Sequence, residues 1–372
     1  MYKGIWIAIV VLVALGAWFA YNKKEPAAPT ADTPIKIGAV LSLTGIAADF
    51  GEAAKKSMEI AVDEINRNGG ISGRTVTLVI EDDRTDPKAA ISAFKKLTDV
   101  DKVDAVVGGI FDFATIPLLP LADSAKVAFL APTEMRIEGG LIPSEHSFVM
   151  MPDFSKVIRE LKTYLAQNET KKLAVVHFKS VFGTQIATTL SEVMGELGRG
   201  PIVDESYNAI GANDFRTTVA KLKQQEVDTV FLDMVDIDPV TFLSRARELD
   251  YHPQVISYYG FTDSFAAQDR DKSLLEGAVI LDWESSSPRF SELYEKRYDT
   301  PAVHSAEKSY MGIYVVANAV AATEKREEVA AYLASHSFET PSGTVTFNAD
   351  HAVDSTTVKI NVVKDGKLVP LP

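Results

Sequence analysis

The sequence predicts an α/β protein in which parallel sheets are covered by helices on both faces. Short apolar runs alternate with amphipathic segments from residue 35 almost to the C-terminus, as in successive βαβ units. The chain has 372 residues, which is too long for one ordinary hydrophobic core, so two lobes are expected. One stretch, VDEINRNGGISGRTVTLVIEDDRTDP at 62–87, contains a helix end, a glycine stop, a strand and an acidic loop in that order.

The first βα unit begins at residue 35. The apolar run IKIGAVLSL (35–43) is typical of a strand buried on both faces. The segment after it repeats apolar residues at helical spacing, and the double glycine at 69–70 tolerates the positive φ of a helix C-terminus. VTLVIE (76–81) is the second strand. Asp86 and Pro87 then predict a new helix, with aspartate as its cap and proline as its first residue.

The same alternation continues along the chain. Further buried strands are predicted at DAVVGGI (104–110), VAFLAP (127–132), KLAVVHF (172–178), DTVFLDM (228–234), PQVISYYG (253–260) and GAVILDW (277–283). Amphipathic helices are predicted at 154–167, 215–225 and 240–249. Near the C-terminus, SGTVTFN (342–348) and TVKINVV (357–363) together predict a closing β element.

An uncharged run precedes this body. Residues 4–21 form it, and as a helix they rise about 27 Å, close to the hydrocarbon thickness of a bilayer. We interpret residues 1–24 as a membrane anchor; a cleavable signal peptide is the alternative, although no clean small-residue cleavage site follows. Residues 25–34, EPAAPTADTP, then form a linker rich in proline and alanine.

Composition excludes several classes of function. The formal net charge of −13 argues against a nucleic-acid partner, which needs clustered Lys and Arg. The chain has no cysteine, which excludes disulfides, thiolate metal sites and a cysteine nucleophile. The six histidines show no metal-binding spacing, and His177 in its strand is interpreted as a satisfied core residue. No phosphate loop, dinucleotide fingerprint or nucleophile elbow follows a strand, so we expect no metal, no cofactor and no enzyme.

The body resembles the type I periplasmic solute-binding proteins, in particular the leucine/isoleucine/valine-binding branch that serves ABC transporters. The stretches that carry the resemblance are IKIGAVLSLTG, AVDEINRNGGISGRTVTLVIEDDRTDPKAA, AVVGG, KLAVVHFKSVFG and FETPSGTVTFN, in family order. The resemblance implies two doubly wound parallel-sheet lobes with a ligand cleft between them. It assigns 35–153 and 284–338 to the first lobe, and 154–283 and 339–372 to the second.

The resemblance also implies a function. The chain is expected to be a receptor at the extracytoplasmic face of the membrane, or in the periplasm, that delivers an amino-acid-like or other small polar ligand to an ABC permease. It is expected to act as a monomer. One alternative is a membrane-tethered sensory domain, against which the lack of a following signalling domain counts. Another, from a different class, is a hydrolase that uses Asp112 and Asp233 as an acid/base pair.

Ligand contacts in the first lobe follow from the family pattern. Amino-acid receptors of this family hold the ligand carboxylate with hydroxyls and amides after the glycine turn, where this chain has Asp112 and Phe113. Asp112 stands where serine is common, and its charge would repel a ligand carboxylate. The alternative is a solvated turn residue or a helix cap. After the VAFLAP strand, Thr133 and Met135 match the contacts to the ligand amine, and Met135 replaces a typical threonine.

Two aromatic residues match cleft walls of the family. Phe50 and Phe182 each precede a glycine, and both stand where the family often carries tyrosine. Without the hydroxyl they favour apolar contact or stacking with a ligand. The alternative for each is an ordinary core or surface residue.

Contacts in the second lobe are predicted at strand ends, where ligands of α/β proteins gather. Asp233 and Asp236 end one strand, and Tyr259 and Thr262 follow the next. The family places an acid or hydroxyl here to hold the ligand amine, and ordinary loop caps are the alternative. If Asp112 converges with Asp233 or Asp236, the ligand is expected to be cationic or rich in amine and hydroxyl donors.

Overall fold

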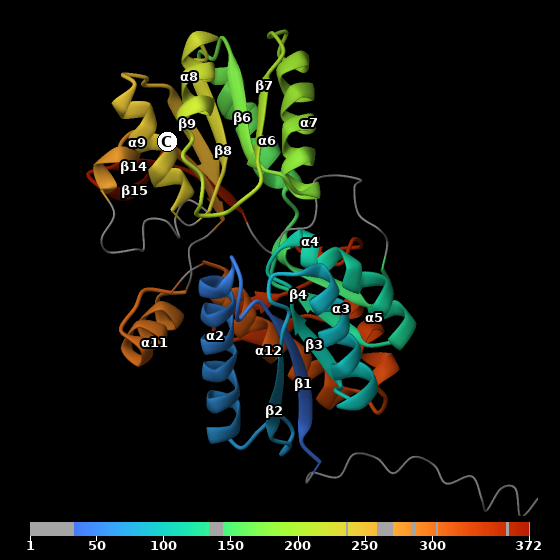
Figure 1. Cartoon of the computed structure of the whole chain (residues 1–372). Coiled ribbons are helices and arrows are strands. Elements are labelled where there is room, and N and C mark those ends of the chain that lie inside the picture. The colour runs from blue at the N-terminus through green and yellow to red at the C-terminus, as the bar shows by residue number, and fades with distance from the viewer. Residues whose placement is uncertain are drawn as a thin grey trace, which may run out of the picture.

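Two open sheets, each covered by helices, form two lobes in the computed structural model (Figure 1). The structure describes residues 33–133, 144–235, 237–258, 271–283, 287–302, 304–354 and 357–371. We call the lobe built on the six-stranded sheet the first lobe and the lobe built on the seven-stranded sheet the second lobe. The predicted two-lobed α/β fold is confirmed.

The sheet of the first lobe is entirely parallel, in the order β13-β5-β4-β3-β1-β2. Its strands are β1 (Ile35–Leu41), β2 (Val76–Asp82), β3 (Ala105–Gly108), β4 (Ala128–Ala131), β5 (Ser147–Pro152) and β13 (Ala352–Val353). The helical elements of this lobe are α2 (Ala48–Arg67), α3 (Pro87–Lys95), η1 (Lys96–Val100), α4 (Asp112–Thr115), η2 (Ile116–Leu118), α5 (Leu119–Ala125), α11 (Pro288–Tyr298), α12 (His304–Ala322), η4 (Arg326–Glu328) and α13 (Val329–Ser335).

The sheet of the second lobe has the order β15-β14-β10-β9-β8-β6-β7. Its strands are β6 (Leu173–Phe178), β7 (Val203–Tyr207), β8 (Thr229–Asp233), β9 (Gln254–Tyr258), β10 (Val279–Trp283), β14 (Val358–Lys364) and β15 (Lys367–Pro370). Its helical elements are α6 (Ser155–Gln167), α7 (Val181–Glu196), α8 (Arg216–Gln224), α9 (Asp238–Glu248) and η3 (Lys272–Leu275). The strands from β7 to β10 are parallel, whereas β14 runs antiparallel to both of its neighbours.

The two sheets share one winding order. Strand order reverses between β1 and β3 in the first lobe and between β6 and β8 in the second. In open α/β sheets, ligands bind beyond the carboxyl ends of the strands at such a switch point. The topology therefore predicts a ligand site at the carboxyl ends of these four strands.

The double glycine ends α2 as predicted. Gly69 and Gly70 have φ of 92° and 79°, and the Gly70 N–H donates to the carbonyl of Ile65 at 2.9 Å. The Asn66 side-chain amide then brackets the backbone of Val76, donating to its carbonyl at 2.9 Å and accepting from its N–H at 2.8 Å. This stretch therefore ends the helix and sets the start of β2 by backbone geometry.

Helix α3 begins with the predicted cap. The Asp86 carboxylate accepts the N–H groups of Lys88 and Ala89 at 3.0 and 2.8 Å, and Pro87 is the first helical residue. We expect Asp86→Ala to lower the free energy of unfolding by about 1 kcal/mol, because these two N–H groups lose their acceptor. Urea unfolding followed by circular dichroism measures the loss. Asp86→Asn keeps an acceptor and should lose less, so equal losses in the two variants would contradict the cap.

The C-terminal part of the chain differs from the prediction. The hairpin β11 (Phe338–Thr340) and β12 (Gly343–Val345) is followed by β13, which pairs with β5 of the first lobe. Phe338, Val345, Phe347 and Val353 of this segment are buried in the core of the first lobe, and the chain returns to the second sheet only at β14. The predicted boundary at 338 is therefore too early. The prediction that 342–348 and 357–363 form one closing β element is also wrong, because the two segments lie in different sheets.

Strands β5 and β7 were not among the predicted strands. β7 is an edge strand in which only Val203 and Tyr207 are buried, so it lacks the continuous apolar run of a central strand. β5 is fully buried, but it follows a long interval after β4. Both segments are strands because each pairs with neighbouring strands of its sheet, which the local sequence pattern does not show.

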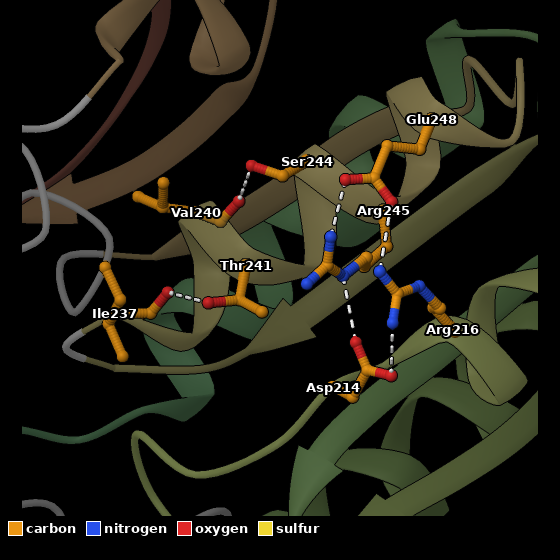
Figure 2. Close-up of polar contacts among 8 residues, drawn as sticks. All are labelled: Asp214, Arg216, Ile237, Val240, Thr241, Ser244, Arg245 and Glu248. Atoms are coloured by element: carbon orange, nitrogen blue, oxygen red, sulfur yellow. Dashed lines mark hydrogen bonds and ion pairs between the residues drawn. The ribbon is translucent and has the colours of Figure 1, made fainter.

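Helices α8 and α9 are joined by four alternating charges (Figure 2). Asp214 accepts from Arg216 at 3.0 Å and from Arg245 at 2.9 Å, and Glu248 lies 2.5 Å from Arg245. Single exposed ion pairs add at most about 1 kcal/mol each, so we attribute local positioning to this network. Between the first two charges, Phe215 has a φ of 56° and packs against the rings of Tyr207 and Phe242.

No helix within the described part of the chain is both long and apolar enough to cross a membrane. The predicted anchor at 1–24 lies outside the described residues, as does most of the linker at 25–34.

Candidate ligand-binding site between the lobes

The ends of β3 and β8 come together where the two lobes touch. Helix α4 lies at the edge of the first lobe that faces the start of α7 in the second lobe (Figure 1). We define the interlobe junction as Asp112, Phe113, Phe178, Phe182 and Asp233. Each of these residues lies at the end of a switch-point strand or at the start of the helix that follows.

Asp112 is the polar centre of the junction. It is 5% exposed and is the first residue of α4. One carboxylate oxygen accepts from the N–H of Phe113 at 2.7 Å, and the other accepts from the N–H of Phe182, in the second lobe, at 2.9 Å. Asp112 is therefore neither solvated nor only a local cap, because its carboxylate links the two lobes.

Asp233 places a second buried carboxyl group beside the first. It is 7% exposed, accepts from the hydroxyl of Tyr258 at 2.5 Å, and its carbonyl accepts from the hydroxyl of Tyr207 at 3.2 Å. Burial, together with the nearby charge of Asp112, raises the pKa of Asp233 to about 6, against the opposing effects of the Tyr258 hydrogen bond and of His177. The predicted convergence of Asp112 and Asp233 is thus present.

A series of aromatic rings crosses the junction. Phe50 lies edge-on to Phe111 at 5.8 Å, and Phe111 stacks on Phe113 at 5.7 Å. Across the junction, Phe113 lies 6.0 Å from Phe178, which lies 5.7 Å from Tyr207. Such contacts contribute about 0.5–1.5 kcal/mol each beyond area burial. The rings nearest the lobe boundary are Phe111, Phe113 and Phe178. All three are half-buried, so part of this aromatic surface stays accessible.

Phe182 acts through its backbone. Its ring is buried against Phe154 at 5.0 Å and near Tyr258 at 6.4 Å, within the hydrophobic core. The ring therefore fits the alternative interpretation, a core residue, while the N–H of Phe182 reaches Asp112.

In each lobe, a glycine follows the aromatic residue near the start of the helix after the first switch-point strand, which is α2 after β1 and α7 after β6. A Cβ at Gly51 would lie 2.0 Å from the carbonyl oxygen of Ser42, at the end of β1. A Cβ at Gly183 would lie 2.2 Å from the carbonyl oxygen of Phe178, at the end of β6. Glycine at both places lets the helix start approach the strand end closely.

The acidic loop of the double-glycine stretch is structural. Asp82 accepts the N–H groups of Leu43, Thr44 and Arg84, and Asp83 accepts from the hydroxyl of Ser42 at 2.7 Å. These bonds tie the loop after β1 to the end of β2. No group of three or more potential metal ligands occurs among the described residues.

The remaining predicted contacts are only partly described. Thr133 follows β4 and is 6% exposed. Met135, Asp236, Tyr259 and Thr262 lie outside the described residues. His177 is satisfied as predicted, because its ring nitrogens lie 2.8 Å from the carbonyl oxygen of Phe178 and 2.9 Å from a carboxylate oxygen of Asp204.

Sequence reasoning missed three residues beside the predicted ones: Phe111, Phe178 and Tyr258. Tyr258 and Phe178 are the last residues of β9 and β6, so the position at a strand end was the signal that could have found them. Phe111 directly precedes α4.

A second charged group links the lobes near the crossover after β10. Lys308 of α12 is 9% exposed and lies near Asp282 of β10 and its neighbour Glu307, both of which are buried. Burial lowers the pKa of Lys308, while the two carboxylates oppose this change. Glu307 also accepts the N–H of Ser287 at 2.9 Å. No sequence motif marked this group.

Two doubly wound lobes that meet at their switch points define the class of two-lobed α/β binding proteins. A family model described as "Periplasmic binding protein" matches residues 34–367, and the chain belongs to that family. The predicted membership of the leucine/isoleucine/valine-binding branch of type I periplasmic solute-binding proteins is confirmed. The chain is therefore a solute-binding receptor with an extracytoplasmic location, and it is not an enzyme.

Two relatives illustrate the range of the family. A Leu/Ile/Val-binding protein homolog 2 from Brucella abortus is 27% identical over 357 residues, which cover 92% of this chain and 91% of the relative. A leucine-, isoleucine-, valine-, threonine- and alanine-binding protein from Pseudomonas aeruginosa is 25% identical and matches over 86% of each chain.

Solved structures share the fold at lower identity. A branched-chain amino acid transporter substrate-binding protein from Streptococcus pneumoniae, in complex with isoleucine, has a TM-score of 0.75 at 23% identity and matches over 91% of this chain and 100% of that chain. A solute-binding protein from R. palustris, in complex with benzoate, has a TM-score of 0.79 at 19% identity and matches over 91% of this chain and 95% of that chain.

Proposed function

We propose that this chain binds one amino-acid-like or other small polar solute between its lobes and delivers it to an ABC importer. The observation that supports this most directly is the interlobe junction, where strand ends of both sheets supply buried polar groups and aromatic rings. A ligand that contacts both lobes adds interactions to the closed state that the open state lacks. The permease then recognises the closed form.

The proposed ligand contacts come from both lobes. In the first lobe they are Phe50, Asp112, Phe113, Thr133 and Met135. In the second lobe they are Asp233, Asp236, Tyr259 and Thr262, whereas the ring of Phe182 lies in the core. Phe50 and Phe113 offer apolar surface, and the two described carboxyl groups offer acceptors for ligand N–H or O–H groups.

We infer that residues 1–24 hold the receptor at the extracytoplasmic face of the membrane and that residues 25–34 act as a tether. The body then works as a monomer beside the permease. The eighteen-residue uncharged run and the following segment rich in proline and alanine support this arrangement.

A ligand screen tests the receptor function. The full-length chain, purified in mild detergent, is melted with amino acids, polyamines, amides and aromatic acids. A ligand at 100 times its Kd adds about 2.7 kcal/mol to the apparent free energy of unfolding, which is a readily measured shift. No stabilisation by any member of a broad solute library would contradict the proposal.

The same screen carries a narrower prediction. We expect leucine and valine to be poor ligands, because the carboxylate of Asp112 repels a ligand carboxylate where the family usually has serine. Neither amino acid should shift the melting temperature at micromolar concentration. A micromolar shift by either would show that the ligand carboxylate avoids Asp112.

A further inference from the structure

The start of α7 is an anion-binding end of a helix that this protein fills with its own carboxylate. The first N–H groups of a helix lack intrahelical acceptors and carry partial positive charge. In α7 the hydroxyl of Ser180 accepts from the N–H of Gly183 at 3.0 Å. The N–H of Phe182 is instead satisfied by Asp112, which belongs to the other lobe. The acceptor is thus supplied across the junction.

The loop that carries Asp112 holds the carboxylate in place. Gly108 and Gly109 have φ of 148° and 80°, and a Cβ at Gly108 would lie 2.1 Å from the carbonyl oxygen of Val40. The hydroxyl of Thr115 donates to the carbonyl of Phe111 at 2.8 Å, which closes the turn around Asp112. Together with the hydrogen bond that Asp112 accepts from the N–H of Phe113, this turn fixes the position of the carboxylate.

A second carboxyl group faces the same part of the junction. A Cβ at Gly183 would lie 3.0 Å from a carboxylate oxygen of Asp233, and Gly183 directly follows the residue bonded to Asp112. Two buried carboxyl groups, one from each lobe, therefore flank the first turn of α7. The half-buried rings of Phe113 and Phe178 lie across the same boundary. Aromatic faces and carboxylates together favour a positively charged group.

We propose that Asp112 is an internal closing group and the specificity-determining residue of this receptor. Its charge-assisted bond to α7 joins the lobes in the way that an anionic group of a ligand could. The ligand then needs no carboxylate at this end, and it brings an amine or another cationic donor group to the side of Asp112 and Asp233. This inference rests on the proposed receptor function and adds the chemical class of the ligand.

The closing role is tested by measuring the distance between the lobes. The chain has no cysteine, so Lys95→Cys on α3 and Glu192→Cys on α7 provide two exposed sites for spin labels. Double electron–electron resonance on the full-length protein without added ligand should show a substantial population with a short distance between the two spin labels. Asp112→Ala should reduce that population at least twofold. An unchanged distance distribution in Asp112→Ala would overturn the closing role.

A matched control separates closure from general loss of stability. Asp104 precedes β3, and its carboxylate accepts the N–H of Lys36 at 2.8 Å within the first lobe. Asp104→Ala therefore removes the same kind of bond at the other end of the same strand, and it should leave the interlobe distances unchanged. Asp112→Asn keeps the shape and one acceptor oxygen, so it is expected to fold and to lose closure partially. A shift in Asp104→Ala equal to that in Asp112→Ala would overturn the proposal.

The ligand class is tested with pairs that differ in one charged group. Isopentylamine is leucine without its carboxylate, and benzylamine replaces the carboxylate of benzoate with a cationic amine. By calorimetry, each amine should bind the wild-type protein at least tenfold more tightly than its acidic partner, and Asp112→Asn should reduce this preference. Equal or tighter binding of the acids, or an unchanged preference in Asp112→Asn, would overturn the inference. Tight binding of an acid would still support a receptor, whereas the absence of any ligand in the broad screen contradicts the receptor function itself.

Discussion

Replacing Gly183 with alanine is expected to lower the free energy of unfolding by about 3 kcal/mol, at the upper end of the usual cost of overpacking. The added Cβ would lie 2.2 Å from the carbonyl oxygen of Phe178 and 2.6 Å from Nδ1 of His177. The nearer atom belongs to the backbone of β6, so the clash is relieved only if α7 moves away from the strand. That movement also displaces the N–H of Phe182 from Asp112 and should weaken ligand binding.

The same helix provides the control. Gly195 lies near the C-terminal end of α7, and a Cβ there would meet nothing within 4 Å. Gly195→Ala should therefore raise the free energy of unfolding by up to about 1 kcal/mol, because alanine favours the helix more than glycine does. Urea unfolding followed by circular dichroism compares the two variants. If Gly183→Ala is as stable as the wild type, the close approach of α7 to β6 is wrong.

Replacing Asp233 with asparagine is expected to stabilise the protein at neutral and alkaline pH. Burial and the charge of Asp112 raise the pKa of Asp233 from 3.8 to about 6, so the folded protein holds this proton more tightly than the unfolded chain does. The resulting stability is present below pH 4 and is lost as the pH rises from about 4 to 6. The change in pKa corresponds to about 3 kcal/mol. Asparagine keeps an acceptor for the hydroxyl of Tyr258 and removes the buried charge.

The pH dependence separates this effect from ordinary repacking. Asp233→Asn should be more stable than the wild type at pH 8, by about 3 kcal/mol, and nearly equal to it at pH 4, as measured by urea unfolding at each pH. Asp82 gives a control of opposite sign. Burial tends to raise the pKa of Asp82, but hydrogen bonds from Thr44, Arg84 and Leu43 lower it below its ordinary value. Asp82→Asn should therefore lose stability at pH 8. An equal effect of Asp233→Asn at both pH values would contradict the buried charge.

Local patterns predicted much of the scaffold. The strand predicted at 104–110 is β3 at Ala105–Gly108, and the helix predicted at 154–167 is α6 at Ser155–Gln167. The cap at Asp86 also formed as expected. These features depend on residues within a few positions of one another, so helical periodicity, apolar runs and turn residues are enough to find them.

The candidate site depended on contacts between distant residues. Asp112 was selected as a departure from the family pattern, but its partner is a backbone N–H in Phe182, a group that no side-chain motif reveals. Tyr258 was missed beside Asp233, since the hydrogen bond between these two side chains depends on how their strands lie against each other in the sheet. The late return of the chain to the second sheet was missed for a similar reason. The hairpin β11–β12 has no local sequence feature that indicates which lobe it packs against.

The sequence by itself determined the alternation of strands and helices in most of the body, the glycine stop after α2 and the class of receptor, since each of these depends on short-range periodicity or on a continuous motif. Only the tertiary structure decided that Asp112 reaches across to α7, that Asp233 lies beside it, and that β13 belongs to the first lobe. The physical reason is that burial and electrostatic interaction act through space. A carboxylate changes its role from solvated turn residue to interlobe link according to which distant groups the fold brings within hydrogen-bonding distance.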